Sequence, residues 1–359
     1  DIISMLEVNR MGNNFKKAIL ILTSIFLVIL TFLYLNKILF VSKEENTKIQ
    51  DKKEEPKVEE KKVSIIDLES KSRTIGVMID NVEAAWPQAG LSDAYLVYEI
   101  IVEGGQTRLF ALFKDKDTSL IGPVRSSRHY YLDYALENDA IYAHFGWSPQ
   151  AQRDIGSLKI NNLNGMTNAS TSYWRDNNGI YAPHNAFTSI EKLKLNIERL
   201  GYRAETNIEP LLNYSVDEID LSKEDNSAIA NTINIKYSYM HYTTYEYDNV
   251  NKVYKRSMLG IPHVDKTTKE QYTTKNIIVI GVNNYLDPEN GDKGRQTLEN
   301  IGTGEGYYIT DGYAIPIIWE KASRDSQTIY KKINGDEIKV NDGNTYIQIQ
   351  PINENLTIE

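Results

Sequence analysis

The sequence predicts an α+β protein whose first folded half is α/β and whose second half is mostly β, after a transmembrane helix and a disordered stalk. Three observations carry this prediction. Residues 18–41 are almost uninterruptedly apolar, residues 73–203 alternate strand-like and helix-like patterns, and residues 204–359 hold strand-like runs separated by Asp-Gly and Asn-Gly turns. The chain is therefore expected to comprise a cytoplasmic N-terminus at 1–17, an anchor, a stalk at 42–72 and two folded domains.

The composition limits the functions that the chain can have. A net charge of −9 argues against nucleic acid as a partner. The absence of cysteine excludes disulfides, thiolate nucleophiles, cysteine zinc sites and a lipidated cysteine within this sequence. Tyrosine is abundant, with 24 residues against 8 phenylalanines, which suits partly hydrated sheets and polar binding faces.

The anchor is predicted from the uncharged run Ala18–Leu35 and its continuation to Val41. This length can span a bilayer if Lys37 extends its amine toward the interface. Lys16 and Lys17 precede the run, so the N-terminus should stay in the cytoplasm and the folded region should lie outside a cell membrane that the chain crosses once. A cleaved signal peptide is the alternative, although no small-residue cleavage site follows the run.

The stalk at 42–72 is rich in lysine and glutamate and has few apolar residues. Such a segment cannot bury enough apolar surface to offset the entropy of ordering, so it is predicted to be mostly disordered. Folded structure is expected to begin near Arg73.

The first half should contain a strand, a hairpin around a Gly-Gly turn, a short helix and another strand. These elements are expected at Thr74–Ile79, Ala94–Val102 with Leu109–Phe113, Tyr130–Leu136 and Ala140–Phe145. Two further helices follow. Ser148 and Pro149 begin one of them, and a capping box of Thr188 and Glu191 begins the other, which Gly201 ends.

The second half should be built mainly from strands and tight turns. The strands are expected at Asn231–Ser238, Tyr242–Tyr247, Lys252–Met258 and Asn276–Val282. Three dipeptides, Asp311-Gly312, Asn334-Gly335 and Asp342-Gly343, are predicted as hairpin turns.

The most distinctive chemistry lies where a Gly-Pro turn leads into the predicted helix at 130–136. Two arginines, two serines and a histidine gather there, beside free backbone N–H groups that favour an anion. A guanidinium also matches carboxylate or phosphate geometry. The alternative is that a serine only caps the helix and the arginines pair with Glu99, Glu103 or Asp133. The ligand-binding residues are expected to be Arg108, Arg125, Ser126, Ser127, Arg128, His129 and Glu103.

Carboxylates near this basic segment raise the question of a metal. Asp80 and Asp93 lie at or near strand ends and could hold Mg²⁺ against phosphate oxygens, although for either one alone a structural role is favoured. Magnesium is the one cofactor that the sequence suggests. The five histidines form no metal motif and are read as hydrogen-bonding loop residues.

Several strings resemble the YerB-like family of bacterial extracytoplasmic proteins over roughly Arg73 to Pro351. They are GVMIDNVEAAWPQAGLSDAYLVYEIIVEGGQTRLFALF, IGPVRSSRHYYLDYALENDAIYAHFGWSPQA, APHNAFTS, GIPHVDK and GTGEGYYITDG. The resemblance implies two extracytoplasmic domains of unknown function, in a family with many lipoproteins. This chain departs from the family in having an apolar segment where a lipidated cysteine would be expected.

A weaker similarity links the first half to LytR-CpsA-Psr glycopolymer transferases. It implies that Asp80 and Asp93 are metal-side acids and that Arg125 and Arg128 bind a pyrophosphate. Leu91 stands where an arginine usually precedes Ser-Asp, and no aspartate follows Arg125, so the similarity supports ligand binding better than catalysis.

We therefore expect a membrane-anchored protein that binds an anionic ligand of the cell envelope, such as a cell-wall precursor, a cell-wall polymer or a lipid phosphate. One alternative is a phosphotransferase acting on a lipid-linked glycopolymer. The other is a scaffold for envelope protein partners. The sequence leaves open whether the protein is an enzyme.

The charge pattern around the anchor gives a testable topology. Protease added outside intact cells should remove the folded region beyond the stalk, because Lys16 and Lys17 retain the N-terminus inside. Immunoblotting with an antibody against the C-terminus measures the loss. Survival of the folded region in intact cells, with digestion only after lysis, would reject this orientation.

Overall fold

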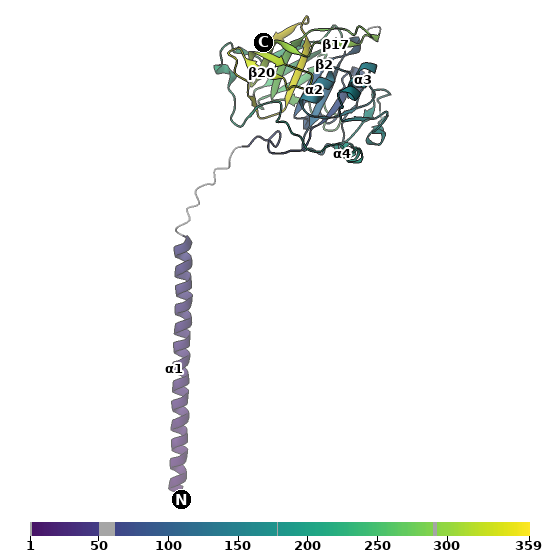
Figure 1. The fold of residues 1–359 in the computed structure, drawn as a ribbon. Helices are drawn as coiled ribbons and strands as arrows, with labels where there is room; N and C mark the ends of the chain where they lie inside the picture. The colour runs from purple at the N-terminus through teal and green to yellow at the C-terminus, as the bar shows by residue number, and fades with distance from the viewer. Residues whose placement is uncertain (1, 50–61, 178, 290–292) are drawn as a thin grey trace. The chain divides into compact units, whose positions relative to one another are not determined.

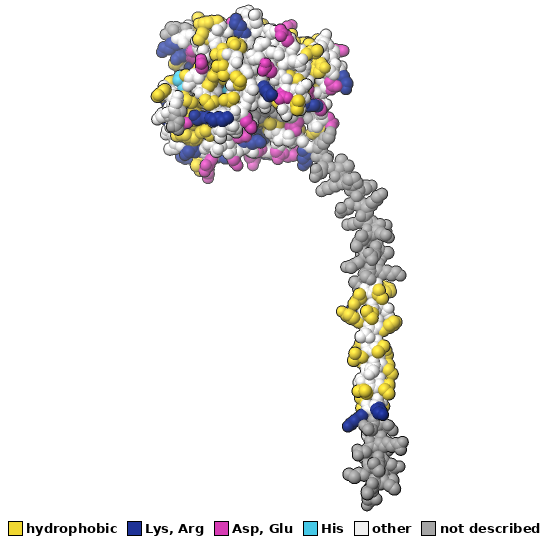
Figure 2. Space-filling model, turned by 180° about the vertical axis from the view of Figure 1, so that it is seen from behind, with side chains coloured by type: hydrophobic (Ala, Val, Ile, Leu, Met, Phe, Trp, Pro, Cys, Tyr) yellow, Lys and Arg dark blue, Asp and Glu magenta, His cyan; other side chains and the backbone are white. Residues whose placement is uncertain are grey.

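The computed structural model describes residues 2–49, 62–177, 179–289 and 293–359. The chain forms two compact units, Asp1–Glu60 and Lys61–Glu359. In the first unit the described residues form one helix, α1 (Ile2–Ile49), shown in Figure 1. Its segment Phe15–Phe40 is long and apolar enough to cross a membrane, by length and composition. Figure 2 shows apolar side chains along this segment and basic side chains at one end of it. The predicted apolar helix is confirmed, and its insertion in a membrane stays a prediction.

The predicted stalk differs from the structure at both ends. Residues 42–49 belong to α1, and residues 50–61 lie outside the described residues. At the other end the chain packs on the folded unit well before residue 73. Ile66 is 4% exposed and belongs to the hydrophobic core. The Ser64 amide and hydroxyl both donate to the Asp342 carboxylate, each at 2.8 Å.

The expected start of folded structure near Arg73 was therefore wrong. Ile66 lies in a short segment with the apolar residues Val63, Ile65 and Leu68, which follows the charged tail and has no clear strand or helix period, so the sequence pattern alone does not reveal that its side chain is buried.

The core of the second unit is an eleven-stranded mixed sheet to which both halves of the chain contribute (Figure 1). Strand β22 lies between β15 and β2 and runs parallel to both. Tyr346 on β22 pairs with Ile277 on one side and Val97 on the other. The expected boundary between residues 203 and 204 does not separate two compact units, because this sheet runs continuously across it.

The sheet strands follow a path from the second half of the chain to the first. In spatial order they are β20 (Ile329–Lys332), β19 (Tyr313–Lys321), β18 (Gly302–Thr310), β15 (Asn276–Val282), β22 (Thr345–Pro351), β2 (Leu96–Ile101), β3 (Thr107–Phe113), β1 (Ile75–Asp80), β4 (Ile141–His144) and β5 (Asn162–Asn164), with β9 (Ala228–Ile229) beside β19.

A second, six-stranded sheet belongs to the second half. Its strands are β13 (Ile261–Pro262), β12 (Val253–Met258), β11 (Tyr242–Asp248), β10 (Thr232–Lys236) and β23 (Leu356–Ile358), with β14 (Thr273–Thr274) beside β12. Three two-stranded ribbons complete the β structure of the described residues. They are β16 (Asn284–Leu286) with β17 (Gln296–Leu298), β8 (Tyr214–Ser215) with β21 (Val340–Asn341), and β6 (Trp174–Arg175) with β7 (Ala186–Phe187).

The α-helices among the described residues of the second unit are α2 (Tyr131–Glu137), α3 (Pro149–Ser157) and α4 (Ile190–Arg199). Ser148 caps α3 as predicted, since its hydroxyl accepts from the Ala151 amide at 3.2 Å. The predicted cap of α4 was wrong by one residue. Ser189 accepts from the Lys192 amide at 3.3 Å, whereas the Thr188 hydroxyl donates to a carbonyl elsewhere in the fold.

The predicted fold class and the main strands are confirmed. The Asp311-Gly312 turn joins β18 to β19 as a hairpin. Asp342-Gly343 does not form a hairpin, because β21 before it pairs with β8 and β22 after it enters the large sheet.

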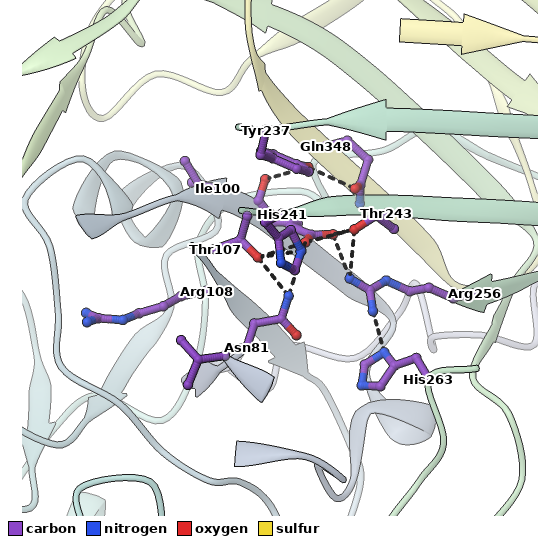
Figure 3. Close-up of polar contacts among 12 residues, drawn as sticks. Asn81, Ile100, Thr107, Arg108, Tyr237, His241, Thr243, Arg256, His263 and Gln348 are labelled. Carbon is purple, nitrogen blue, oxygen red and sulfur yellow. Dashed lines mark hydrogen bonds and ion pairs between the residues drawn. The ribbon is translucent and has the colours of Figure 1, made fainter. Parts of the chain in front are cut away.

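A buried ion pair joins the two halves of the chain. Glu99 on β2 and Arg256 on β12 are both fully buried, and a terminal guanidinium nitrogen lies 2.7 Å from the carboxylate. Thr107 also donates to this carboxylate, at 2.9 Å, and His241 lies 3.0 Å from it. Figure 3 shows this cluster of side chains, drawn from strands of both halves. Every charge in it has a partner, as burial requires.

A second buried pair repeats the arrangement. Lys321 on β19 contacts Glu137 on α2 at 2.7 Å, and both side chains are almost completely buried. Tyr98 and Thr328 donate to the same carboxylate at 2.7 and 2.6 Å. Separating the two halves of the chain would break both ion pairs and leave four charged groups without their partners.

Removing the Ile66 side chain tests whether residues before 73 belong to the folded unit. Ile66→Ala should lower the free energy of unfolding by about 2–5 kcal/mol, because the truncation leaves a cavity in the core. Leu68→Ala is the control, since Leu68 is 38% exposed in the same segment and should cost clearly less. Urea denaturation of the full chain in detergent measures both. If both variants lowered the free energy of unfolding by the same small amount, the segment would not be part of the folded unit and would belong to the stalk.

The Glu99–Arg256 pair should also control stability toward acid. Burial opposes ionisation, but Arg256 and His241 together lower the pKa of Glu99 from 4.5 to about 2. A carboxylate with a depressed pKa stabilises the fold at pH values above its unfolded pKa, and that stability is lost as the pH falls toward about 2. Glu99→Gln should therefore lower the unfolding free energy by about 3–5 kcal/mol at neutral pH, because Arg256 stays buried without its counter-ion.

The same variant should flatten the decline of stability between pH 4.5 and about 2. Glu246→Gln is a matched control, because Glu246 is exposed on the neighbouring strand β11 and its loss should change stability by at most about 0.5 kcal/mol. Thermal unfolding of the unaltered protein and of both variants across this pH range measures the pH dependence of their stability. An unchanged acid limb in the Glu99 variant would show that other carboxylates control acid unfolding.

Candidate functional site

The candidate site is a pocket at the ends of β1, β2 and β3. Its volume is about 320 Å³. Five basic side chains and two carboxylates line it, together with Gln106 and two valines. The charged lining residues are Asp80, Glu103, Arg108, Arg125, Arg128, Lys293 and Arg295. Three predicted arginines and the predicted Glu103 therefore meet in one pocket, and their binding of a ligand stays a prediction.

The strand register places the acidic and basic groups together. Asp80 is the last residue of β1 and pairs with Arg108 on β3. Glu103 begins the turn between β2 and β3, which closes through Gly104 and Gly105 at φ values of 67° and 69°. Glycine adopts this left-handed conformation without strain, so the turn brings Glu103 back toward the start of β3.

Two further basic residues come from the second half and were missed by the sequence analysis. Lys293 and Arg295 lie in the loop that leads into β17. The only local signal is a glycine between two basic residues, which is too common to indicate a site. Their contribution to the pocket depends on the fold, because the large sheet brings the two halves together.

Glu103 is shared by three arginines. Arg128 makes a close contact through Nε, Arg108 lies 3.6 Å away and Arg295 lies 3.8 Å away. Burial alone would raise the pKa of Glu103, but Arg128 and Arg108 outweigh it and lower the pKa. One carboxylate therefore compensates only part of the charge of its three partners.

The neighbouring positive charges affect the pKa of Arg108. It is 5% exposed, and burial together with the neighbouring charge of Arg128 lowers the pKa of Arg108 to about 10. Figure 3 shows its side chain pointing away from the buried cluster, while the preceding residue Thr107 points into that cluster. The alternation of side chains along β3 thus assigns these neighbours to opposite faces of the sheet.

Asp80 is the second acidic wall of the pocket. Its carboxylate is buried, with Arg125 Nε 3.1 Å and His184 Nδ1 2.8 Å from the same oxygen. Gln88 fixes the backbone at this point, since its amide donates to the Asp80 carbonyl at 2.9 Å and its oxygen lies 2.8 Å from His263. The pocket is thereby connected to the cluster that holds Arg256.

The two predicted serines do not offer hydroxyl groups to the pocket. The Ser126 hydroxyl donates to the Phe145 carbonyl at 3.0 Å, and the Ser127 hydroxyl accepts from Tyr142 at 3.0 Å. Their backbone carbonyls accept from Arg108 and Arg128 instead. Both serines therefore orient arginines and are not among the lining residues.

His129 and the helix terminus also face elsewhere. His129 is 9% exposed, its Nε2 lies 3.2 Å from the Thr297 hydroxyl, and burial lowers its pKa to about 4. The amides of Tyr131 and Leu132 donate to carbonyls of the preceding turn at 3.1 and 3.2 Å. The predicted anion cradle of helix N–H groups is therefore replaced by a cradle of guanidinium groups.

The predicted magnesium ligands are separated by the length of a strand. Asp80 lines the pocket, and so does Glu103, which follows β2. Asp93 precedes β2 and therefore lies at the opposite end of this strand, away from the pocket. There its carboxylate accepts a hydrogen bond from the Thr118 hydroxyl at 2.7 Å. Among the described residues no group of three or more acidic or histidine side chains could hold a metal ion. Asp80 alone of the two lines the pocket, and magnesium stays a prediction.

Comparisons with known proteins agree with this architecture. The N-terminal domain of the family described as "Protein of unknown function (DUF3048)" matches residues 63–203, and its C-terminal domain matches residues 233–347. The Bacillus subtilis (strain 168) protein named "Putative lipoprotein YerB" is 28% identical over 271 residues, or 76% of each chain. The crystal structure of YerB from Bacillus subtilis matches with a TM-score of 0.70 and 26% identity, over 80% of this chain and 94% of that one.

These matches confirm the predicted YerB-like family and lend no support to the weaker similarity with LytR-CpsA-Psr transferases. The N-terminal match begins at residue 63, where the chain starts to pack on the folded unit. Because both domains are matched in order along most of the folded unit, the chain belongs to the DUF3048 family.

Proposed function

We propose that this protein binds an anionic ligand of the cell envelope, such as a cell-wall precursor or polymer, in the pocket at the ends of β1, β2 and β3. The observation that carries the proposal is the lining of this pocket, where five basic side chains surround two carboxylates. Guanidinium groups bind phosphate and carboxylate through paired hydrogen bonds, and four of the five basic groups are guanidiniums.

The electrostatics of the pocket favour an added anion. Glu103 is divided among three arginines, and Arg108 carries a lowered pKa because it is buried beside Arg128. A bound phosphate or carboxylate would supply negative charge where the protein lacks it. Water is partly excluded at such a buried position, which strengthens the interaction.

The anchor supports a place at the envelope. Phe15–Phe40 has the length and composition of a membrane span, and the matched relative from Bacillus subtilis is named a lipoprotein. A lipoprotein is tethered by a lipid, whereas this cysteine-free chain would be tethered by an apolar helix. Both devices would hold a folded domain of the same family at a membrane.

The transferase and scaffold alternatives have less support. Asp80 is the predicted metal-side acid in the pocket, and its carboxylate already contacts Arg125 and His184. Ligand binding that requires added Mg²⁺ would favour the transferase. Isolation of a stable protein partner together with unmeasurable anion binding would favour the scaffold.

Substitution of Arg125 tests the binding role directly. Arg125→Ala should weaken the binding of pyrophosphate by roughly ten- to a hundredfold, the equivalent of about 1.5–3 kcal/mol for a charge-assisted contact. Arg125→Lys should also bind more weakly, because an ammonium cannot make a paired contact. Isothermal titration calorimetry on the full chain in detergent measures both. Arg153→Ala is the control, since Arg153 is exposed and pairs with Glu289, and neither residue lines the pocket.

Glu103→Gln separates binding from a purely structural role in the same assay. If the arginines exist to bind a ligand, removing the carboxylate that competes for them should tighten pyrophosphate binding. If they serve only as internal partners, the glutamine and the Arg125 variants should lower the melting temperature and leave binding unchanged. That second pattern would overturn the proposed function.

A further inference from the structure

His184 lies beside the anion pocket without being part of its cationic lining. Its Nδ1 is 2.8 Å from an Asp80 carboxylate oxygen, and Arg125 Nε is 3.1 Å from that same oxygen. The imidazole of His184 and the guanidinium of Arg125 therefore both contact the same buried carboxylate oxygen of Asp80. Because Asp80 and Arg125 both line the pocket, His184 contacts one of the side chains that form its wall.

The loop between β6 and β7 holds the ring in this position. The His184 amide donates to the Tyr181 carbonyl at 2.9 Å. The next residue, Asn185, is 1% exposed, accepts from Arg175 at 2.7 Å and donates to Asn177 at 2.7 Å. The His184 side chain keeps 24% of its surface exposed, so part of the ring is open to solvent.

Asp80 also determines which ring nitrogen can accept a hydrogen bond. An ionised carboxylate has no hydrogen to donate, so Nδ1 must carry the hydrogen in this contact. In a neutral imidazole Nε2 then has a free lone pair. Within the described part of the chain, this Nε2 makes no hydrogen bond, and the hydrogen bonds of His184 involve Nδ1 and the backbone.

We propose that His184 forms a second subsite, in which Nε2 accepts a hydrogen bond from a hydroxyl group of a ligand whose phosphate is held by Arg125. This inference rests on the proposed anion-binding function and narrows the ligand to a phosphorylated sugar or polyol. Phosphate fits better than carboxylate, because five basic groups against two acids favour a dianion. A hydroxyl fits better than an ammonium group, which the neighbouring arginines would repel.

A pair of probes isolates the hydroxyl contact. Glycerol 1-phosphate and propyl phosphate have the same number of carbons and the same charge, and they differ in hydroxyl groups. The full chain in detergent should bind glycerol 1-phosphate about three- to tenfold more tightly, as one added hydrogen bond predicts. His184→Ala should abolish this preference and leave the affinity for propyl phosphate unchanged. Tyr181→Ala, an exposed change in the same loop, should keep the preference.

The other outcomes each decide the matter. Equal affinity of the unaltered protein for the two probes would overturn the subsite. An equal loss of affinity for both probes in His184→Ala would also overturn it, because the ring would then contact the phosphate or only support the loop. In both cases binding that depends on Arg125 would leave the proposed function standing. Absence of any phosphate binding would remove the proposed function and this inference together. His184→Gln keeps a side-chain acceptor and should retain part of the preference, which distinguishes a lost contact from a damaged loop.

Discussion

A carboxylate that is fully buried needs a positive charge beside it, and here the charge beside Glu99 comes from the other half of the chain. The pair with Arg256 takes both groups out of water, so neither half can adopt its final packing while the other is missing. The pair of Glu137 and Lys321 imposes the same condition at a second place. These contacts, together with the shared sheet, explain why two domain-sized sequence matches lie in one compact unit.

The same condition determines how the pocket is built. Thr107 on β3 donates to Glu99, and the next residue along the strand therefore lies on the opposite face. That residue is Arg108, whose charge is held beside Arg128 near a single shared carboxylate. The two buried ion pairs each balance one negative with one positive charge, whereas the pocket lining holds five basic groups and two carboxylates. A site that is stable but incompletely neutralised is suited to a ligand that arrives from solution.

Much of the fold could be read from local patterns, because strand alternation, turn glycines and a serine-proline helix start are local properties. The gathering of Arg108, Arg125 and Glu103 could also be anticipated, since a hairpin and a turn bring them to the same strand ends. Arg295 could not be found, because its place depends on pairing between distant strands. The hydroxyl of Ser126 was misjudged for a different reason. Which way a side chain points in an irregular turn follows no period, so sequence spacing carries no information about it.

The position of β22 has a consequence for the order of events during biosynthesis. This strand, Thr345–Pro351, lies in the middle of the large sheet between β15 and β2, yet it follows every other strand of that sheet in the sequence. Until β22 has been made, β2 lacks its neighbour on one side and keeps an open strand edge, so the large sheet cannot join the two halves of the chain. Loss of β22 alone would therefore divide the large sheet between β15 and β2, and both halves of the chain would be affected together.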